Sequence, residues 1–181
     1  MSNTSDTSRE PPRIGLSDAA PPHAYDPVTQ PEYFEGVLSR RLMAFLVDAI
    51  LIFGAVVLFY IFVLLMGVVT LGLSWIAFFF IWPTFVITAL AYNALTLGSP
   101  ASATLGMRLM DIEVRTWYGA PCYALLGAVH AVCFWVSVSV FTPFVLLVAL
   151  FNDRRRLLHD FLVGTVVVNN SQRADALRRR S

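Results

Sequence analysis

Residues 42–66 read LMAFLVDAILIFGAVVLFYIFVLLM and contain a single charged side chain, Asp48. A helix of this length covers a hydrocarbon core of about 30 Å with some tilt. No charged residue follows between Asp48 and Arg108, whereas the surface loops of a soluble domain would need charge within such a distance. The stretch therefore predicts a membrane-spanning helix in an integral membrane protein.

The composition of the chain indicates the same class of protein. Hydrophobic residues make up 57% of the 181 residues and charged residues 14%, against about a quarter charged in a typical soluble domain. The net charge of +1 argues against the basic surface that nucleic-acid binding requires. We therefore expect the lipid bilayer as a partner and no nucleic acid.

Two further apolar stretches follow the first. Residues 74–97 predict a second span, which Pro83 should kink because proline removes a helix hydrogen bond. Residues 122–151 form a third apolar stretch, longer than one crossing needs and too short for two full crossings with a turn. The expected fold class is an all-α membrane protein with about three transmembrane helices.

The path of the third stretch has two alternatives. All arginines lie in the N-terminal segment, the 98–121 loop or the C-terminal segment, and the positive-inside rule favours the cytoplasm for all three. Since Thr142-Pro143 also breaks the stretch, we favour a bent or re-entrant helical pair that returns to the cytoplasmic face, giving an effective even number of crossings. The alternative is one long tilted span with the C-terminus outside.

The chain divides into three parts. Residues 1–36 are polar and rich in proline, so they predict a disordered N-terminal tail in the cytoplasm. Residues 37–168 form the transmembrane domain, and residues 169–181 form a basic C-terminal tail. Residues from Met110 onward alternate between polar and apolar, and residues 162–168 are β-branched. These two stretches predict a small surface β pair.

Asp48 is the first candidate functional residue. An ionised aspartate inside a membrane helix costs about 2.5–3.5 kcal/mol, so such residues usually face a partner or a wet cavity. Arg41 precedes it by seven residues, nearly two helical turns, so both side chains project from one face. Asp160 can reach Arg41 if the third stretch returns to the cytoplasmic face. The candidate charge set is therefore Arg41, Asp48 and Asp160.

Several polar residues could support this set. We expect Asn93, at the end of the second span, to form a hydrogen bond with Asp48 or with a loop. Arg156 precedes Asp160 by four residues, as in a helical surface pair, and His159 has an ordinary pKa near neutrality. The supporting candidates are Arg40, Asn93, Arg108, Arg156 and His159.

Signals for an enzyme or a metal site are weak. Cys122 and Cys133 lie in or beside apolar sequence without a metal-type spacing, and His130 stands alone in an apolar stretch. The sequence has no nucleophile with a suitably spaced base and no glycine-rich phosphate loop. We therefore expect no enzyme activity, no metal and no cofactor.

Three stretches of the chain resemble the RDD family of bacterial membrane proteins, which is named for one arginine and two aspartates. They are SRRLMAFLVDAIL at 39–51, SATLGMRLMDIEV at 102–114 and RRRLLHDFLVGTVVV at 154–168. The resemblance implies that the arginine is Arg41, with Arg40 as the weaker choice. It implies that the aspartates are Asp48 and Asp160.

The resemblance has one departure and carries limited functional information. Family members often have lysine after the Thr-x-Gly step, where this chain has Met107 beside Arg108. The family implies a bacterial inner membrane and a role in transport, without an agreed ligand.

Two functions stay open from the sequence. In the first, the Arg/Asp set forms a polar path for a proton or small cation, and so few spans would then require a homo-oligomer. In the second, the chain is a non-enzymatic membrane subunit or assembly protein whose Arg/Asp set is structural.

Overall fold

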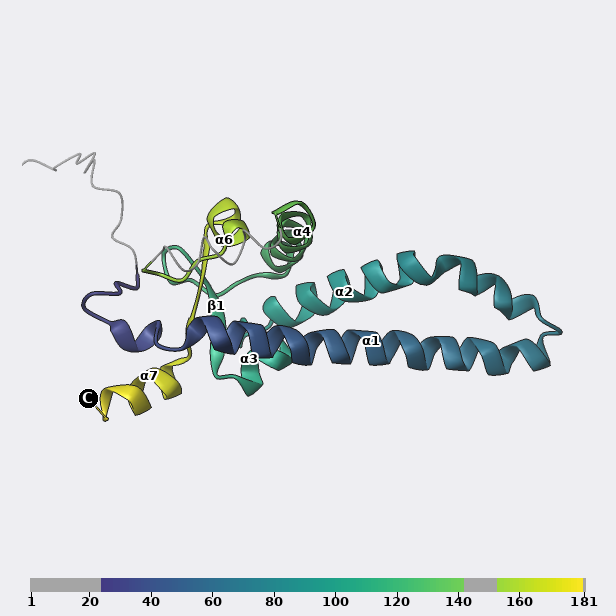
Figure 1. Cartoon of the computed structure of the whole chain (residues 1–181), viewed down its shortest axis with the longest axis horizontal. Coiled ribbons are helices and arrows are strands. Elements are labelled where there is room, and N and C mark those ends of the chain that lie inside the picture. The colour runs from purple at the N-terminus through teal and green to yellow at the C-terminus, as the bar shows by residue number, and fades with distance from the viewer. Residues whose placement is uncertain (1–23, 142–152, 181) are drawn as a thin grey trace, which may run out of the picture.

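A long helical hairpin is the main feature of the computed structural model, which describes residues 24–141 and 153–180 (Figure 1). Helix α1 covers Val37–Val69, and the 3-10 helix η2 (Leu73–Phe80) and helix α2 (Ile81–Leu97) return alongside it. One face of α1 is buried at positions three or four residues apart, as expected for a helix packed on one side. Those residues are Val37, Arg41, Ala44, Asp48, Ile52, Val56, Tyr60, Val63 and Gly67.

The returning arm of the hairpin changes helix type. Gly72 has a φ of 87° in the turn, a conformation that glycine adopts without a steric penalty. The 3-10 helix ends at Phe80 and the α-helix begins at Ile81. Pro83 therefore lies in the first turn of α2, where its missing N–H costs no helix hydrogen bond. The sequence predicted a kink at Pro83. The structure instead has a change from 3-10 helix to α-helix just before this residue.

A small polar body caps the open end of the hairpin. Its elements are the 3-10 helix η1 (Pro31–Tyr33), α3 (Leu105–Leu109), β1 (Ile112–Thr116), α6 (Leu158–Val163), β2 (Thr165–Asn169) and α7 (Ser171–Arg178). We call residues 24–36, 99–123 and 153–180 the cap. Strands β1 and β2 pair antiparallel, with Ile112 opposite Asn169 and Thr116 opposite Thr165. The predicted β pair is confirmed.

Part of the expected N-terminal tail is ordered, so the tail prediction is wrong for residues 24–36. Phe34 is buried against Val166 and Val168, with Tyr25 and Tyr33 packed around them. These aromatic groups bury enough apolar surface to offset the ordering of a short segment. The prediction of disorder rested on the average composition of residues 1–36, which is polar despite these aromatic residues.

The expected C-terminal tail also carries structure. Asn169 belongs to β2, and its Nδ2 donates to the carbonyls of Glu32 (2.8 Å) and Glu35 (2.9 Å). Helix α7 begins after Asn170, whose side chain accepts from the N–H of Arg173. An asparagine in this position satisfies one free amide of the first turn.

The third apolar stretch contains α4 (Ala124–Phe141), while residues 142–152, including the expected break at Thr142-Pro143, lie outside the described residues. Figure 1 shows α4 almost along its axis, whereas α1 and α2 lie lengthwise. Beyond residue 152 the chain is back at the cap, where α6 packs on α4.

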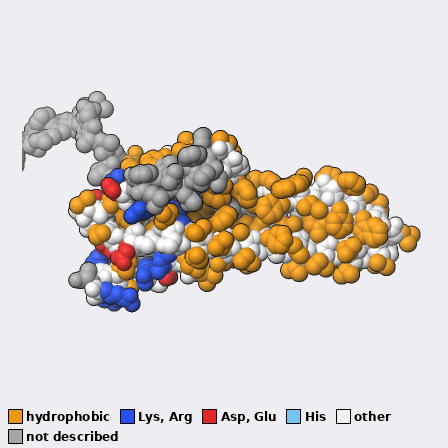
Figure 2. All heavy atoms as spheres, viewed as in Figure 1, with side chains coloured by type: hydrophobic (Ala, Val, Ile, Leu, Met, Phe, Trp, Pro, Cys, Tyr) orange, Lys and Arg blue, Asp and Glu red, His pale blue; other side chains and the backbone are white. Residues whose placement is uncertain are grey.

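The distribution of side chains along the molecule matches a membrane protein (Figure 2). The projecting part of the hairpin is covered with apolar side chains, and the charged side chains gather at the cap. Within the described residues, Pro31–Val69 and Leu73–Leu97 are long and apolar enough to cross a membrane, and Ala124–Val140 is a shorter apolar helix. The molecule is mostly helical with a two-stranded sheet.

Candidate functional site

The structure divides the expected charge set into two groups. Arg41 and Asp160 form one group, and Asp48 lies further along α1 in the other. Arg41 Nη1 donates to Asp160 Oδ2 at 2.6 Å, and the exposed fractions of the two side chains are 8% and 0%. Burial at this depth removes the hydration of both charged groups. Their mutual attraction and their hydrogen bonds must therefore offset the lost hydration energy.

Asp160 sits in the first turn of α6, where a carboxylate also meets the positive end of the helix dipole. Its Oδ2 accepts from the N–H of Leu157 at 2.9 Å in addition to Arg41. Burial by itself would raise the pKa of Asp160, but the Arg41 guanidinium and the two neighbouring histidines hold it well below its usual range. Asp160 is therefore ionised at neutral pH.

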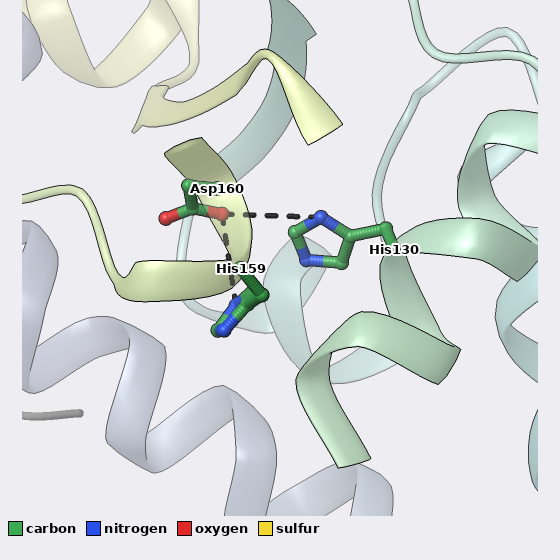
Figure 3. Close-up of side chains that lie close together, drawn as sticks. All are labelled: His130, His159 and Asp160. Atoms are coloured by element: carbon green, nitrogen blue, oxygen red, sulfur yellow. Dashed lines mark ion pairs between the residues drawn. The ribbon is translucent and has the colours of Figure 1, made fainter. Parts of the chain in front are cut away.

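Two histidines face the other carboxylate oxygen of Asp160 (Figure 3). His159 Nε2 lies 3.6 Å from Oδ1, and His130 Nδ1, which comes from α4, lies 3.8 Å from it. Burial lowers the pKa of His159 to about 3, although the charge of Asp160 opposes this shift. Because His159 is neutral at pH 7, the charge of Asp160 is balanced there by Arg41.

The neighbours of His159 determine its tautomer. Arg41 Nη2, which can only donate, lies 3.5 Å from His159 Nε2, so Nε2 carries a lone pair. The proton then resides on Nδ1, which donates to Ser137 Oγ at 3.3 Å. Ser137 in turn donates to the carbonyl of Phe134 at 3.0 Å. His159 therefore presents its Nε2 lone pair to Arg41, and Asp160 Oδ1 lies 3.6 Å from the same nitrogen.

Arg156 fastens the segment around Asp160 through backbone groups. Its Nε donates to the carbonyl of Thr165 (2.9 Å) and its Nη2 to the carbonyl of Asp160 (2.7 Å). The guanidinium also stacks on the rings of Trp117, 4.4 Å from the centroid, and Phe161, 4.1 Å. The expected surface pair between the Arg156 and Asp160 side chains is wrong, because Arg156 is buried and binds the main chain.

Asp48 forms the second group, and within residues 24–141 and 153–180 its hydrogen-bond donors are uncharged. Its Oδ1 accepts from Tyr92 Oη at 2.5 Å and from the N–H of Gly106 at 2.8 Å. Its Oδ2 accepts from Thr104 Oγ1 at 2.6 Å. Three donors from α2 and α3 thus satisfy a carboxylate on α1, and hydrogen bonds to a charged group are stronger than neutral ones.

Among the remaining supporting candidates, Arg40 and Arg108 bind loop carbonyls, whereas Asn93 bonds within its own helix. Asn93 donates to the carbonyl of Ala89 in its own helix (2.9 Å), so the alternative that paired it with Asp48 is wrong. Arg40 donates to the carbonyl of Met110 at 2.5 Å. Arg108 donates to the carbonyl of Ala103 at 3.2 Å and to Ser99 Oγ at 2.8 Å.

The three resembling stretches thus meet in space: the first supplies Arg41 and Asp48, the second Thr104 and Gly106, and the third Asp160. The RDD family model matches residues 36–164. The chain belongs to the RDD family. No curated protein and no solved structure matches the chain. Family membership and the two long apolar helices together identify an RDD-family membrane protein.

Sequence reasoning missed the three partners of Asp48 and the place of His130 in this RDD protein. Tyr92 was assigned no role, and Thr104 and Gly106 belonged to a motif without an assigned role. His130 looked isolated because its partners lie on α6, far along the chain. The Thr-x-Gly step could have indicated the binding partners of Asp48. The hydroxyl of Thr104 and the backbone N–H of Gly106 are two donors that can bind one carboxylate.

The buried polar groups differ in the chemistry they can support. Asp160 with Arg41 is a compensated buried pair, and Asp48 is surrounded by neutral donors. The His130–His159–Asp160 cluster presents nitrogen and oxygen atoms that suit a metal ion, and it is the one such grouping found within residues 24–141 and 153–180.

Proposed function

We propose that the hairpin crosses the bacterial inner membrane twice and that the cap, with both termini, lies in the cytoplasm. From Ala49 to Val69, α1 extends roughly 30 Å beyond the cap, which equals the thickness of a hydrocarbon core. The arginine-rich cap fits the cytoplasmic face under the positive-inside rule. In this arrangement Asp48 stands near the membrane interface instead of deep within the lipid.

Helix α4 fits the membrane interface better than a third full crossing. Its exposed side chains form an apolar stripe, and its buried face carries His130 and Ser137. Polar groups therefore point into the protein and apolar groups point outward, as expected for a helix whose outer face meets lipid. The exposed stripe contains Leu125, Val129, Val132, Val136 and Val140.

The topology can be tested by cysteine labelling in a variant that lacks Cys122 and Cys133. Thr70→Cys, at the hairpin turn, should react with a membrane-impermeant maleimide in intact spheroplasts. Tyr118→Cys and Arg180→Cys, both on exposed cap positions, should react only after the membrane is permeabilised. Labelling of Arg180→Cys in intact spheroplasts would rule out the proposed arrangement.

We propose that the chain acts as a non-enzymatic membrane subunit or assembly protein whose Arg/Asp groups brace the cap against the hairpin. The observation that supports this proposal is the set of hydrogen bonds that Tyr92, Thr104 and Gly106 donate to the Asp48 carboxylate. These bonds tie α1 to α2 and α3, so they fasten the cap at the foot of the hairpin. Arg41 and Asp160 do the same for α1 and α6.

The hairpin supplies the surface through which such a subunit would act. Large apolar side chains along both arms are exposed, and lipid or the helices of another membrane protein would cover them. Two crossing helices cannot enclose a polar path, so a homo-oligomer or a larger membrane complex is the form in which we expect the chain to work. Ile50, Phe53, Leu58, Phe62 and Leu65 are among the exposed residues of α1.

The bracing role predicts that Asp48→Asn lowers stability. The amide replaces a charged acceptor by a neutral one and turns its NH₂ group toward a donor, so we expect a loss of about 1.5–3 kcal/mol. Thermal unfolding of the full chain in detergent, followed by size-exclusion profile, measures this change. Asp153→Asn makes the same chemical change at an exposed position and should melt like the wild type. An Asp48→Asn variant that also melts like the wild type would contradict the bracing role.

Transport of a proton or small cation is the second candidate. One observation favours it: the Asp48 carboxylate and the hydroxyls of Tyr92 and Thr104 form an all-oxygen set of the kind that hard cations accept. Proteoliposomes with an imposed sodium or proton gradient test this function. Flux above that of empty vesicles, lost in Asp48→Asn at unchanged stability, would support transport over bracing.

A further inference from the structure

Three atoms of ligand type converge where α4 packs on α6 of the cap, without bonding one another. They are His130 Nδ1, His159 Nε2 and Asp160 Oδ1, and one ligand atom from each residue lies within 4.8 Å of the other two (Figure 3). All three side chains are buried. Neither nitrogen is close enough to Oδ1 for a normal hydrogen bond, since the distances are 3.8 Å and 3.6 Å.

We infer that His130, His159 and Asp160 bind one divalent transition-metal ion, with zinc as the fitting probe. Two imidazoles and one carboxylate are a ligand set that zinc and other first-row ions accept. A tetrahedral zinc ion with ligands at about 2.1 Å holds neighbouring ligand atoms about 3.4 Å apart. The two separations from Oδ1 exceed this value only slightly. Ligand atoms of the cluster lie up to 4.8 Å apart, so the two imidazoles must also move toward each other to close the site.

The groups behind two of the ligands hold them in the required state. Ser137 Oγ accepts a hydrogen bond from His159 Nδ1, which leaves Nε2 unprotonated. The Nε2 lone pair now accepts from Arg41 Nη2, which would move aside for the ion. Arg41 and the N–H of Leu157 both bind Asp160 Oδ2, so Oδ1 is the oxygen that faces the histidines. Metal sites commonly have such outer hydrogen bonds, which orient the ligands.

Thr165 completes the surroundings of the cluster. Its Oγ1 lies 3.3 Å from His130 Nδ1 and 3.5 Å from Asp160 Oδ1. The hydroxyl can donate to Asp160 or stand beside the ion as a weak oxygen neighbour. A water molecule would supply the fourth ligand in the usual manner of an open site.

The charge of Arg41 sets the expected affinity. The guanidinium already balances Asp160, so a divalent ion adds net positive charge to a buried region. Arg41 and the ion would bind different oxygens of the Asp160 carboxylate, but the ion would displace Arg41 Nη2 from the Nε2 lone pair of His159, 3.5 Å away. We therefore expect a dissociation constant in the micromolar range, weaker than that of a zinc finger.

The metal can be measured directly on the full chain. The protein is purified in detergent with a histidine-free affinity tag, stripped with a chelator, and equilibrated with Zn²⁺ or Co²⁺. We expect one zinc per chain by isothermal titration, and Co²⁺ should give visible absorption bands of a four- or five-coordinate nitrogen–oxygen site. His130→Gln should weaken the binding at least tenfold, and His159→Gln should do the same.

The matched control is His23→Gln, which removes the third histidine of the sequence, a residue outside the described part of the chain. Its zinc affinity should equal that of the wild type. Absence of stoichiometric Zn²⁺ and Co²⁺ binding to the wild type at 100 µM metal would overturn the inference, and so would unchanged binding in a folded His130→Gln variant. The bracing role of Asp48 is tested separately, because neither outcome depends on it.

Discussion

Asp160→Asn is expected to be the most damaging single substitution in this protein. The amide keeps the shape of the side chain but removes the charge that compensates Arg41, whose side chain is only 8% exposed. Leaving one member of a buried pair uncompensated typically costs about 3–5 kcal/mol. Since a folded domain is stable by about 5–15 kcal/mol, this loss consumes a large part of the total.

The measurement for Asp160→Asn is the yield of monodisperse protein in detergent, together with its unfolding temperature. Asp175→Asn is the matched control, because Asp175 pairs with Arg178 at the surface with side-chain exposures of 57% and 55%, and such pairs contribute little. The double variant Arg41→Met with Asp160→Leu should recover part of the stability, since both charges leave together. A wild-type melting temperature for Asp160→Asn would contradict this account of the buried pair.

Gly106→Ala is expected to have the second largest effect. A Cβ at this position would lie 2.2 Å from the carbonyl oxygen of Ala44 and 2.8 Å from Asp48 Oδ1. The first contact is with the backbone of α1, which cannot turn away as a side chain can. Overpacking costs about 1–3 kcal/mol, and moving α3 outward also breaks the Gly106 N–H bond to Asp48, so we expect a loss at the upper end of this range or beyond.

Gly54→Ala is the matched control for Gly106→Ala. A Cβ on Gly54, also in α1, meets nothing within 4 Å, and alanine is the better helix former by about 1 kcal/mol. Gly54→Ala should therefore melt at or above the wild-type temperature, while Gly106→Ala should melt well below it. Equal melting temperatures for the two variants would mean that α3 does not depend on close contact with α1.

The elements that could be predicted from sequence are those with a local pattern. Apart from Asp48, residues 42–66 are uncharged and mostly apolar, because a helix that crosses lipid must be apolar along most of its length, and this pattern is visible without any tertiary contact. The alternation after Met110 and the valines before Asn169 marked the two strands, which pair as expected. The proximity of Arg41 and Asp160 was expected from the placement of arginines, because the positive-inside rule predicts the same side of the membrane for both segments.

The site itself was predictable only in part. The two aspartates stood out because charge is rare in apolar sequence, but the partners of Asp48 are hydroxyls and a backbone amide. Tyr92, Thr104 and Gly106 are ordinary residues in membrane proteins, so their types do not mark them. They bind Asp48 because α3 lies very close to α1. This close approach is possible because Gly106 has no Cβ, which would collide with the carbonyl oxygen of Ala44.

The sequence by itself determined the class of protein, the apolar helices and the charges that must be compensated, because these follow from composition and spacing along one segment. Only the tertiary structure decided which groups compensate them. Arg41 pairs with Asp160 and not with Asp48, since the returning chain carries α6 against the foot of α1 while α3 covers the next turns. Likewise His130 and His159, each unremarkable in its own segment, meet because α4 packs on α6. Side chains from distant segments converge through packing, and no local pattern records that convergence.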